Sequence, residues 1–133
     1  MLDFEALSTE ARALGGEISF RKLLRNIAGK RAIVRATCYI EAHTPPFART
    51  ALTASGFSVL VKDEQVATTM ATDALALIEQ VDALVLCPAS PFESELLLRL
   101  AEHGPCVEAA SFDGTAPTGT SARILGKECM FTP

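Results

Sequence analysis

The amino-acid sequence predicts an α/β fold with three layers, α-β-α, around a mostly parallel, doubly wound sheet. Short apolar segments rich in β-branched residues alternate along the chain with segments of helical periodicity. The apolar segments carry few charges, which is typical of strands buried on both faces of a parallel sheet. Only Met1-Leu2-Asp3 precedes the first helical segment, so the first strand is expected to be shortened or missing.

Four later segments are predicted to be strands because each is a short apolar run bounded by turn residues. They cover residues 32–40, 57–61, 83–87 and 106–112. Strands that alternate with helices in this way form right-handed βαβ units, which explains the expectation of a doubly wound sheet.

The helical segments are marked by their start and stop residues. Helices are expected over residues 4–14 and 19–28, separated by Gly15-Gly16, and from Thr44-Pro45-Pro46 to Gly56. Apolar residues at helical spacing predict two more helices, around 70–81 and 92–100. The second of these has a strong start, because Ser90 can cap it, Pro91 takes its first position and Glu93 completes a capping box.

Length and composition indicate one domain over residues 1–133. The chain has 133 residues, of which 49 % are hydrophobic, so it can bury a full core. No apolar run approaches the roughly 18 residues that a membrane helix needs. The N-terminus is acidic where a signal peptide would be basic, and we therefore expect a cytoplasmic protein that does not bind membranes.

The charge balance argues against a dedicated nucleic-acid binder. The formal net charge is −4, from 12 basic and 16 acidic residues, whereas a dedicated nucleic-acid binder usually carries a positive excess because phosphate neutralisation supplies most of its affinity. Basic residues nevertheless gather in one stretch, where they can form a patch for phosphates or an acidic partner, or simply a solvated helix face. The patch comprises Arg21, Lys22, Arg25, Lys30 and Arg31.

The sequence lacks the residue patterns of zinc sites, hydrolases and P-loop nucleotide-binding sites. The cysteines form no CxxC pair, and neither histidine accompanies a GxSxG nucleophile motif, so zinc and hydrolase sites are not indicated. The segment from Gly114 to Ser121 has the glycine spacing of a P-loop, but Thr120 stands where the lysine should be. A flexible loop before a last helix is the preferred interpretation, and a nucleotide-binding loop is the least favoured one.

Carboxylates are the remaining candidates for catalysis. Asp3 ends the first strand and Asp73 lies in a helix, while Asp63 and Glu64 follow the strand at 57–61. The turn after the strand at 83–87, where metal ligands would be expected in such a sheet, contains no acid.

The order of these segments resembles the NYN domain, a branch of the PIN-like nucleases, over nearly the whole chain. Residues 2–7 resemble the opening of that family, 66–75 its acidic helix, and 81–92 the strand and Ser-Gly-Asp-x-Asp-Phe turn of its active site. The resemblance implies a PIN-like, Rossmann-like fold and a ribonuclease site that holds Mg²⁺ or Mn²⁺ on aspartates.

The chain departs from this pattern at the positions that matter for catalysis. Asp3 matches the first metal-binding aspartate and Asp73 a further acidic position. The other matched positions carry no acid or amide, namely Ala6 for the asparagine and Ala67, Ala89 and Pro91 for the aspartates. These losses imply a catalytically inactive domain without a cofactor. The alternative is a weak ribonuclease with Mg²⁺ or Mn²⁺ on Asp3 and Asp73.

An inactive domain of this kind is expected to bind a protein, a second copy of itself, or RNA that it does not cleave. A stunted first strand would leave backbone groups of the sheet exposed, and a homodimer or a strand from a partner would cover them.

Overall fold

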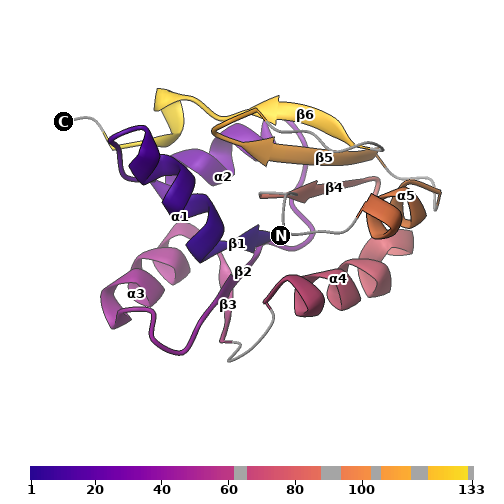
Figure 1. Cartoon of the computed structure of the whole chain (residues 1–133), viewed down its shortest axis with the longest axis horizontal. Helices are drawn as coiled ribbons and strands as arrows, with labels where there is room; N and C mark the ends of the chain where they lie inside the picture. The colour runs from indigo at the N-terminus through magenta and orange to yellow at the C-terminus, as the bar shows by residue number, and fades with distance from the viewer. Residues whose placement is uncertain (62–65, 88–93, 103–105, 115–119, 132–133) are drawn as a thin grey trace.

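The computed structural model describes residues 1–61, 66–87, 94–102, 106–114 and 120–131. Within these ranges, parallel strands form two sets of three neighbours (Figure 1). The first set contains β1 (Leu2–Asp3), β2 (Thr37–Ile40) and β3 (Ser58–Val61). The second contains β4 (Ala83–Leu86), β5 (Cys106–Ser111) and β6 (Ser121–Ile124).

The two-residue strand β1 joins the two sets into one sheet. Leu2 pairs in parallel with Cys38 on one side and with Cys87 on the other. The Asp3 amide donates to the Cys87 carbonyl at 2.9 Å, and the Cys87 amide donates to the Met1 carbonyl at 2.9 Å. The strand order is therefore β3-β2-β1-β4-β5-β6.

The first strand is short, as predicted, but its expected consequence is wrong. Because β1 lies in the centre of the sheet and is paired along both edges, its shortness exposes no open sheet edge. Even the amino group of Met1 donates to the Val85 carbonyl, at 2.8 Å. In the described part of the chain, the open edges belong to β3 and β6.

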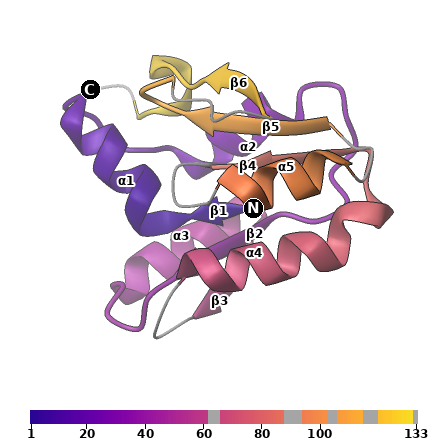
Figure 2. The ribbon, with the colours of Figure 1, turned by 45° about the vertical axis from the view of Figure 1, so that its right-hand side comes forward.

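Helices cover both faces of the sheet, which confirms the predicted three-layer arrangement (Figures 1 and 2). The helices α1 (Phe4–Ala13), α2 (Phe20–Ala28) and α3 (Pro46–Ser55) pack on one face. The helices α4 (Val66–Leu77) and α5 (Ser94–Glu102) pack on the other, together with the 3₁₀ turn η1 (Ile78–Gln80).

The two faces of the sheet carry separate hydrophobic clusters because side chains alternate along each strand. Cys38 and Ile40 point into the cluster under α1, α2 and α3, whereas Tyr39 between them belongs to the cluster under α4 and α5. On β4, Leu84 and Leu86 belong to this second cluster. The apolar sequence of the central strands reflects their burial from both sides.

Most predicted helices are confirmed, with shifted ends. α3 ends at Ser55, and the capping residue after it, Gly56, has a φ of 108°, which favours glycine. The predicted start of the helix around 92–100, at Ser90, lies outside the described residues. The strand predicted over 32–40 is confined to β2, Thr37–Ile40.

The end of the chain differs from the prediction. The expected last helix is instead the strand β6, followed by the short 3₁₀ turn η2 (Lys127–Cys129). β6 pairs in parallel with β5, placing Ala122 beside Ala109 and Arg123 beside Ala110. The conformation of this segment is decided by its pairing with β5, and not by its local sequence preference.

An ion-pair cluster ties the end of α2 to the sheet. The largely buried carboxylate of Glu108 on β5 binds Arg31, which follows α2, and Arg123 on β6, whose Nη2 lies 2.8 Å away. Arg123 also donates to the Asn26 carbonyl of α2 at 3.3 Å. Burial alone would raise the pKa of Glu108, but the hydrogen bonds and charges of the two arginines outweigh it and lower the pKa.

Among the described residues, no helix is long and apolar enough to cross a lipid bilayer.

Replacing Glu108 should destabilise the fold at neutral pH. We expect Glu108→Gln to lower the free energy of unfolding by about 2 kcal/mol, because two arginines lose their anionic partner. Since the pKa of Glu108 is lowered in the folded protein, its stabilising effect exists above the ordinary glutamate pKa of about 4.3 and disappears as the pH falls below it.

Urea unfolding at pH 7 and at lower pH measures this difference. Glu102→Gln on the exposed side of α5 is the matched control and should leave stability nearly unchanged. Equal stability of Glu108→Gln and wild type at pH 7 would contradict the assigned role of the cluster.

Candidate functional site

The carboxyl ends of β1, β2 and β4 meet at the point where the strand order reverses. β1 leads into α1 on one face of the sheet, and the helix that follows its neighbour β4 in the chain, α5, packs on the other face. Open α/β sheets bind ligands in the crevice at this switch point. Asp3 lies there at the end of β1, and Glu41 follows the end of β2.

Asp3 caps a helix at this position. The residue is buried, and its Oδ1 accepts a hydrogen bond from the Ala6 amide at 3.3 Å in the first turn of α1. Burial raises the pKa of Asp3, the bond from Ala6 opposes that effect, and the nearby charge of Glu41 raises the pKa further. The carboxylate therefore satisfies one of the free amides at the start of α1.

Asp73 is held by a tyrosine of the neighbouring strand. The Tyr39 hydroxyl donates to Asp73 Oδ2 at 2.6 Å, and Tyr39 lies directly beside Asp3 in the register of β1 and β2. Burial, followed by the hydrogen bond and charge of Asp73, raises the pKa of Tyr39 well above its ordinary value. Tyr39 therefore stays protonated at neutral pH and fixes the carboxylate of Asp73.

Asp3 and Asp73 therefore both lie next to Tyr39 of β2, Asp3 as its partner in the sheet and Asp73 as the acceptor of its hydroxyl. They do not form a metal centre. Among the residues whose positions are described, no three His, Cys, Asp or Glu side chains are arranged to hold a metal ion. A catalytic Mg²⁺ or Mn²⁺ ion requires several oxygen ligands at about 2.0–2.1 Å. The described residues thus do not fit the ion that the nuclease resemblance implies.

The structure describes only some of the other positions that match the NYN pattern. Ala6 supplies the backbone amide that Asp3 caps. Ala67 is the second residue of α4. Ala89 and Pro91 lie outside the described residues, as do Asp63 and Glu64.

Sequence reasoning missed the surroundings of His43. Its Nδ1 lies 3.2 Å from a carboxylate oxygen of Glu41, and its Nε2 lies 3.7 Å from one of Glu5, at the start of α1. The Glu-x-His spacing of Glu41 and His43 was the available signal, but the contribution of Glu5 depends on the packing of α1 beside β2.

Some side chains of the predicted basic patch make contacts within the fold. Arg31 binds Glu108, and Lys22 donates to the Met130 carbonyl at 3.3 Å, so both side chains hold internal elements together. Arg21 and Arg25, one helical turn apart on α2, and Lys30 are exposed. Two of the five basic residues of the predicted patch are therefore held by contacts within the fold, although Arg31 itself stays exposed.

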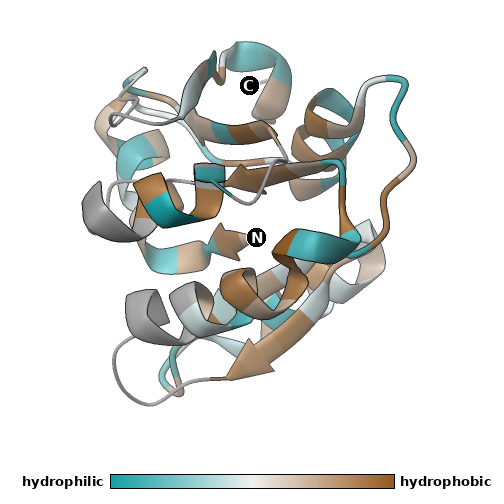
Figure 3. Cartoon of the chain, turned by 90° about the vertical axis from the view of Figure 1, so that its right-hand side faces the viewer, coloured by the Kyte–Doolittle hydropathy of each residue, from teal (hydrophilic) through white to brown (hydrophobic). Residues whose placement is uncertain are grey.

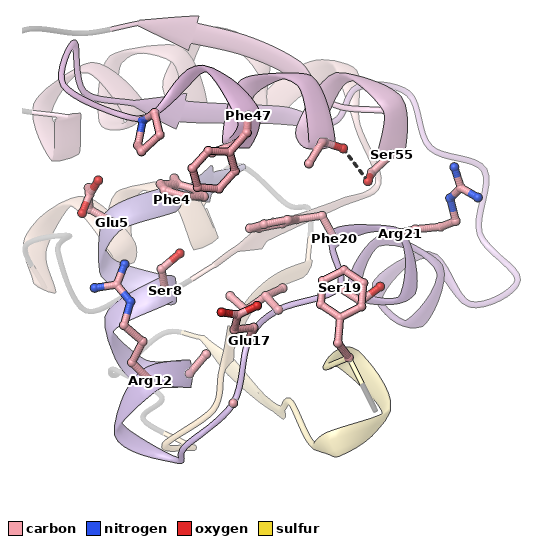
Figure 4. A pocket seen from close by; sticks show the side chains of 17 residues that line it. Phe4, Glu5, Ser8, Arg12, Glu17, Ser19, Phe20, Arg21, Phe47 and Ser55 are labelled. Atoms are coloured by element: carbon pink, nitrogen blue, oxygen red, sulfur yellow. Dashed lines mark hydrogen bonds between the residues drawn. The ribbon is translucent and has the colours of Figure 1, made fainter. Parts of the chain in front are cut away.

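An apolar cleft of about 710 Å³ lies between α1, α2 and α3. Phe4 and Phe20 begin α1 and α2 and stack with their ring centres 5.8 Å apart. Phe47 in the first turn of α3 is 77 % exposed, and Phe131 also lines the cleft. Figure 4 shows Phe4, Phe20 and Phe47 directed towards the same space, with Arg12 and Arg21 at opposite ends.

The sequence contained a signal for this cleft that composition alone does not reveal. Each of three helices carries a phenylalanine in its first turn, at positions 4, 20 and 47. Only the packing of the three helices on one face of the sheet brings these rings together. A cavity of this size and apolar lining suits a ligand with large apolar groups.

The role of Asp3 can be tested by two substitutions. Asn is a good helix cap without a charge, so Asp3→Asn should be at least as stable as wild type at pH 7. Because the pKa of Asp3 is raised, its ionisation destabilises the fold at neutral pH, and the advantage of Asp3→Asn should vanish as the pH falls towards the ordinary aspartate value of about 3.9. Asp3→Ala loses the cap and should be about 1 kcal/mol less stable than Asp3→Asn.

Thermal unfolding of the three proteins between pH 4 and pH 8 gives the comparison. A marked loss of stability in Asp3→Asn would show that the charge itself is required, contrary to the capping role.

Comparison with known proteins agrees with the geometry described above. A crystal structure of a protein of unknown function from Vibrio parahaemolyticus matches this fold with a TM-score of 0.77. The match covers 98 % of this chain and 93 % of that chain, at 16 % sequence identity. A search of curated proteins found no match. The NYN domain family matches residues 1–129, and the chain therefore belongs to the NYN domain family.

Proposed function

We propose that this chain is a catalytically inactive NYN domain that works as a protein-binding module. The observation that carries the proposal is the use of both retained acids in structural contacts. Asp3 caps α1, and Asp73 is bound to the Tyr39 hydroxyl. Alanine or proline stands at the three other aspartate positions of the family pattern, namely 67, 89 and 91.

Two-metal and one-metal nuclease chemistry needs carboxylates that hold the ion and leave room for an activated water. In this chain one carboxylate is buried against a helix start and the other is shared with a tyrosine hydroxyl. The proposed function therefore includes no cofactor.

The surface favours a protein over RNA as the partner. The cleft between α1, α2 and α3 is lined mainly by apolar groups, and its rim carries both signs of charge, with Arg12 and Arg21 alongside Glu17. A polyphosphate backbone would meet Glu17 as well as the arginines, whereas a protein segment can place apolar side chains in the cleft and pair with both signs at its rim. The occupant we propose is a protein segment with aromatic or large aliphatic side chains.

The loss of catalysis is tested by metal binding and RNA cleavage. Calorimetric titration of the purified protein with millimolar Mg²⁺ or Mn²⁺ should show no heat of specific ion binding. Single-stranded RNA should remain intact in the presence of either ion. The Asp3→Asn/Asp73→Asn double variant is the control for contaminating nuclease. Cleavage that requires a divalent ion and disappears in Asp3→Asn would establish the alternative, a weak metal-dependent ribonuclease.

The binding role of the cleft is tested with an aromatic probe. Binding of 8-anilinonaphthalene-1-sulfonate should enhance its fluorescence, and Phe47→Ser should weaken that binding by about tenfold, since one buried aromatic contact accounts for about 1–2 kcal/mol. Leu98→Ser on α5, which replaces an exposed apolar side chain on the opposite face, should bind the probe as wild type does. Equal effects of the two substitutions would argue against the cleft as the binding surface.

A further inference from the structure

The strand β3 is an open edge of the sheet. It pairs in parallel with β2 through Ser58–Val61, and among the described residues no strand lies on its other side. Figure 3 shows β3 as the brown arrow along the bottom of the molecule, coloured as one of its more apolar segments. Open apolar edges are sites where another strand can add to a sheet.

The backbone of β3 presents free hydrogen-bonding groups at alternate residues. The Ser58 amide donates to the Ala36 carbonyl at 2.8 Å, so the polar groups of Ser58 point towards β2. Because backbone groups alternate along a strand, those of Leu60 also point towards β2, and those of Val59 and Val61 point away from the sheet.

Within Ser58–Val61, two of the usual protecting features of an edge strand are absent. Ser58-Val59-Leu60-Val61 contains no charge and no proline, although natural edge strands commonly carry them. Leu60 is 40 % exposed and Val61 is 42 % exposed. The helix α4 packs against β2, where Asp73 meets Tyr39.

We propose that β3 pairs antiparallel with β3 of a second copy of this chain, across a two-fold axis through Leu60. In this register the outward amide and carbonyl of Val59 pair with those of Val61 of the second copy. The two-fold axis repeats this pair on its other side, which gives about four hydrogen bonds in total. The two Leu60 side chains meet at the axis on the same face of the joined sheet. The proposal names one partner for the binding module and does not depend on the loss of catalysis.

The sequence of the strand favours a second copy over an unrelated strand. Val59-Leu60-Val61 reads the same in both directions, so antiparallel pairing about Leu60 sets a β-branched residue opposite a β-branched residue and leucine opposite leucine. Such apolar cross-strand pairs stabilise sheets, and no like charges meet across Ser58–Val61. An isologous contact of this kind closes as a dimer.

The expected association is weak. Strands of four residues bury less than the roughly 1,200 Å² of total area that stable complexes need. We therefore expect a dissociation constant on the order of 10–100 µM. Sedimentation velocity from about 5 to 500 µM brackets this range and should show a dimer that grows with concentration.

A proline substitution isolates the backbone contact. Val61→Pro removes an amide that points away from β2, so the pairing within the monomer is kept and the proposed pairing between copies is lost. We expect Val61→Pro to weaken dimerisation by at least about tenfold. Val61→Thr keeps the amide and a β-branched side chain, and should dimerise much as wild type does. Thermal unfolding confirms that both variants fold.

A charge exchange tests the register. Leu60→Lys and Leu60→Glu should each be monomeric, because like charges would meet at the axis, whereas an equimolar mixture of the two should form a heterodimer. Wild type that stays monomeric over the whole range, or folded Val61→Pro that dimerises as wild type does, would overturn the proposal. Failure of the charge-exchange mixture to associate would overturn the register through Leu60. None of these results bears on the tests for metal binding, RNA cleavage or the cleft.

Discussion

The sheet depends on the backbone hydrogen bonds of a strand of two residues. β1 is the link between the trio β1-β2-β3 and the trio β4-β5-β6, because Leu2 pairs with Cys38 on one side and with Cys87 on the other. Leu2 is almost completely buried between them. Three backbone bonds, including that of the Met1 amino group to Val85, hold the β4 side. The position of Asp3 at the switch point follows from this pairing.

The polar groups at that carboxyl edge are engaged with each other and with the fold. Asp3 caps α1, the Tyr39 hydroxyl holds Asp73, and His43 lies beside Glu41 and Glu5. In an active metal site, a crowd of carboxylates is balanced by the cation. Here, within the described residues, the Ala6 amide and the Tyr39 hydroxyl donate hydrogen bonds to the two retained aspartates, which is the basis for proposing a binding role.

The two proposed interaction surfaces arise from different causes. The cleft exists because α1, α2 and α3 meet with their phenylalanine-bearing first turns together, which leaves space between the helices. The open edge exists because β3 is the last strand on its side of the sheet. One surface offers apolar side chains and a rim of mixed charge, and the other offers backbone groups. Different partners can therefore use them.

Local patterns in the sequence determined the α/β class, the short first strand, the ends of α1, α2 and α3, and the resemblance to the NYN family. They did so because helix caps, glycine stops and apolar periodicity act between residues that are close in the chain. Contacts between distant segments were decided only by the tertiary structure. Four features join residues that are far apart in sequence. They are the central position of β1, the pairing of β6 with β5, the ion pair of Glu108 with Arg31, and the cleft lined by Phe4, Phe20 and Phe47. A pattern within one segment carries no information about which distant segment will pack against it.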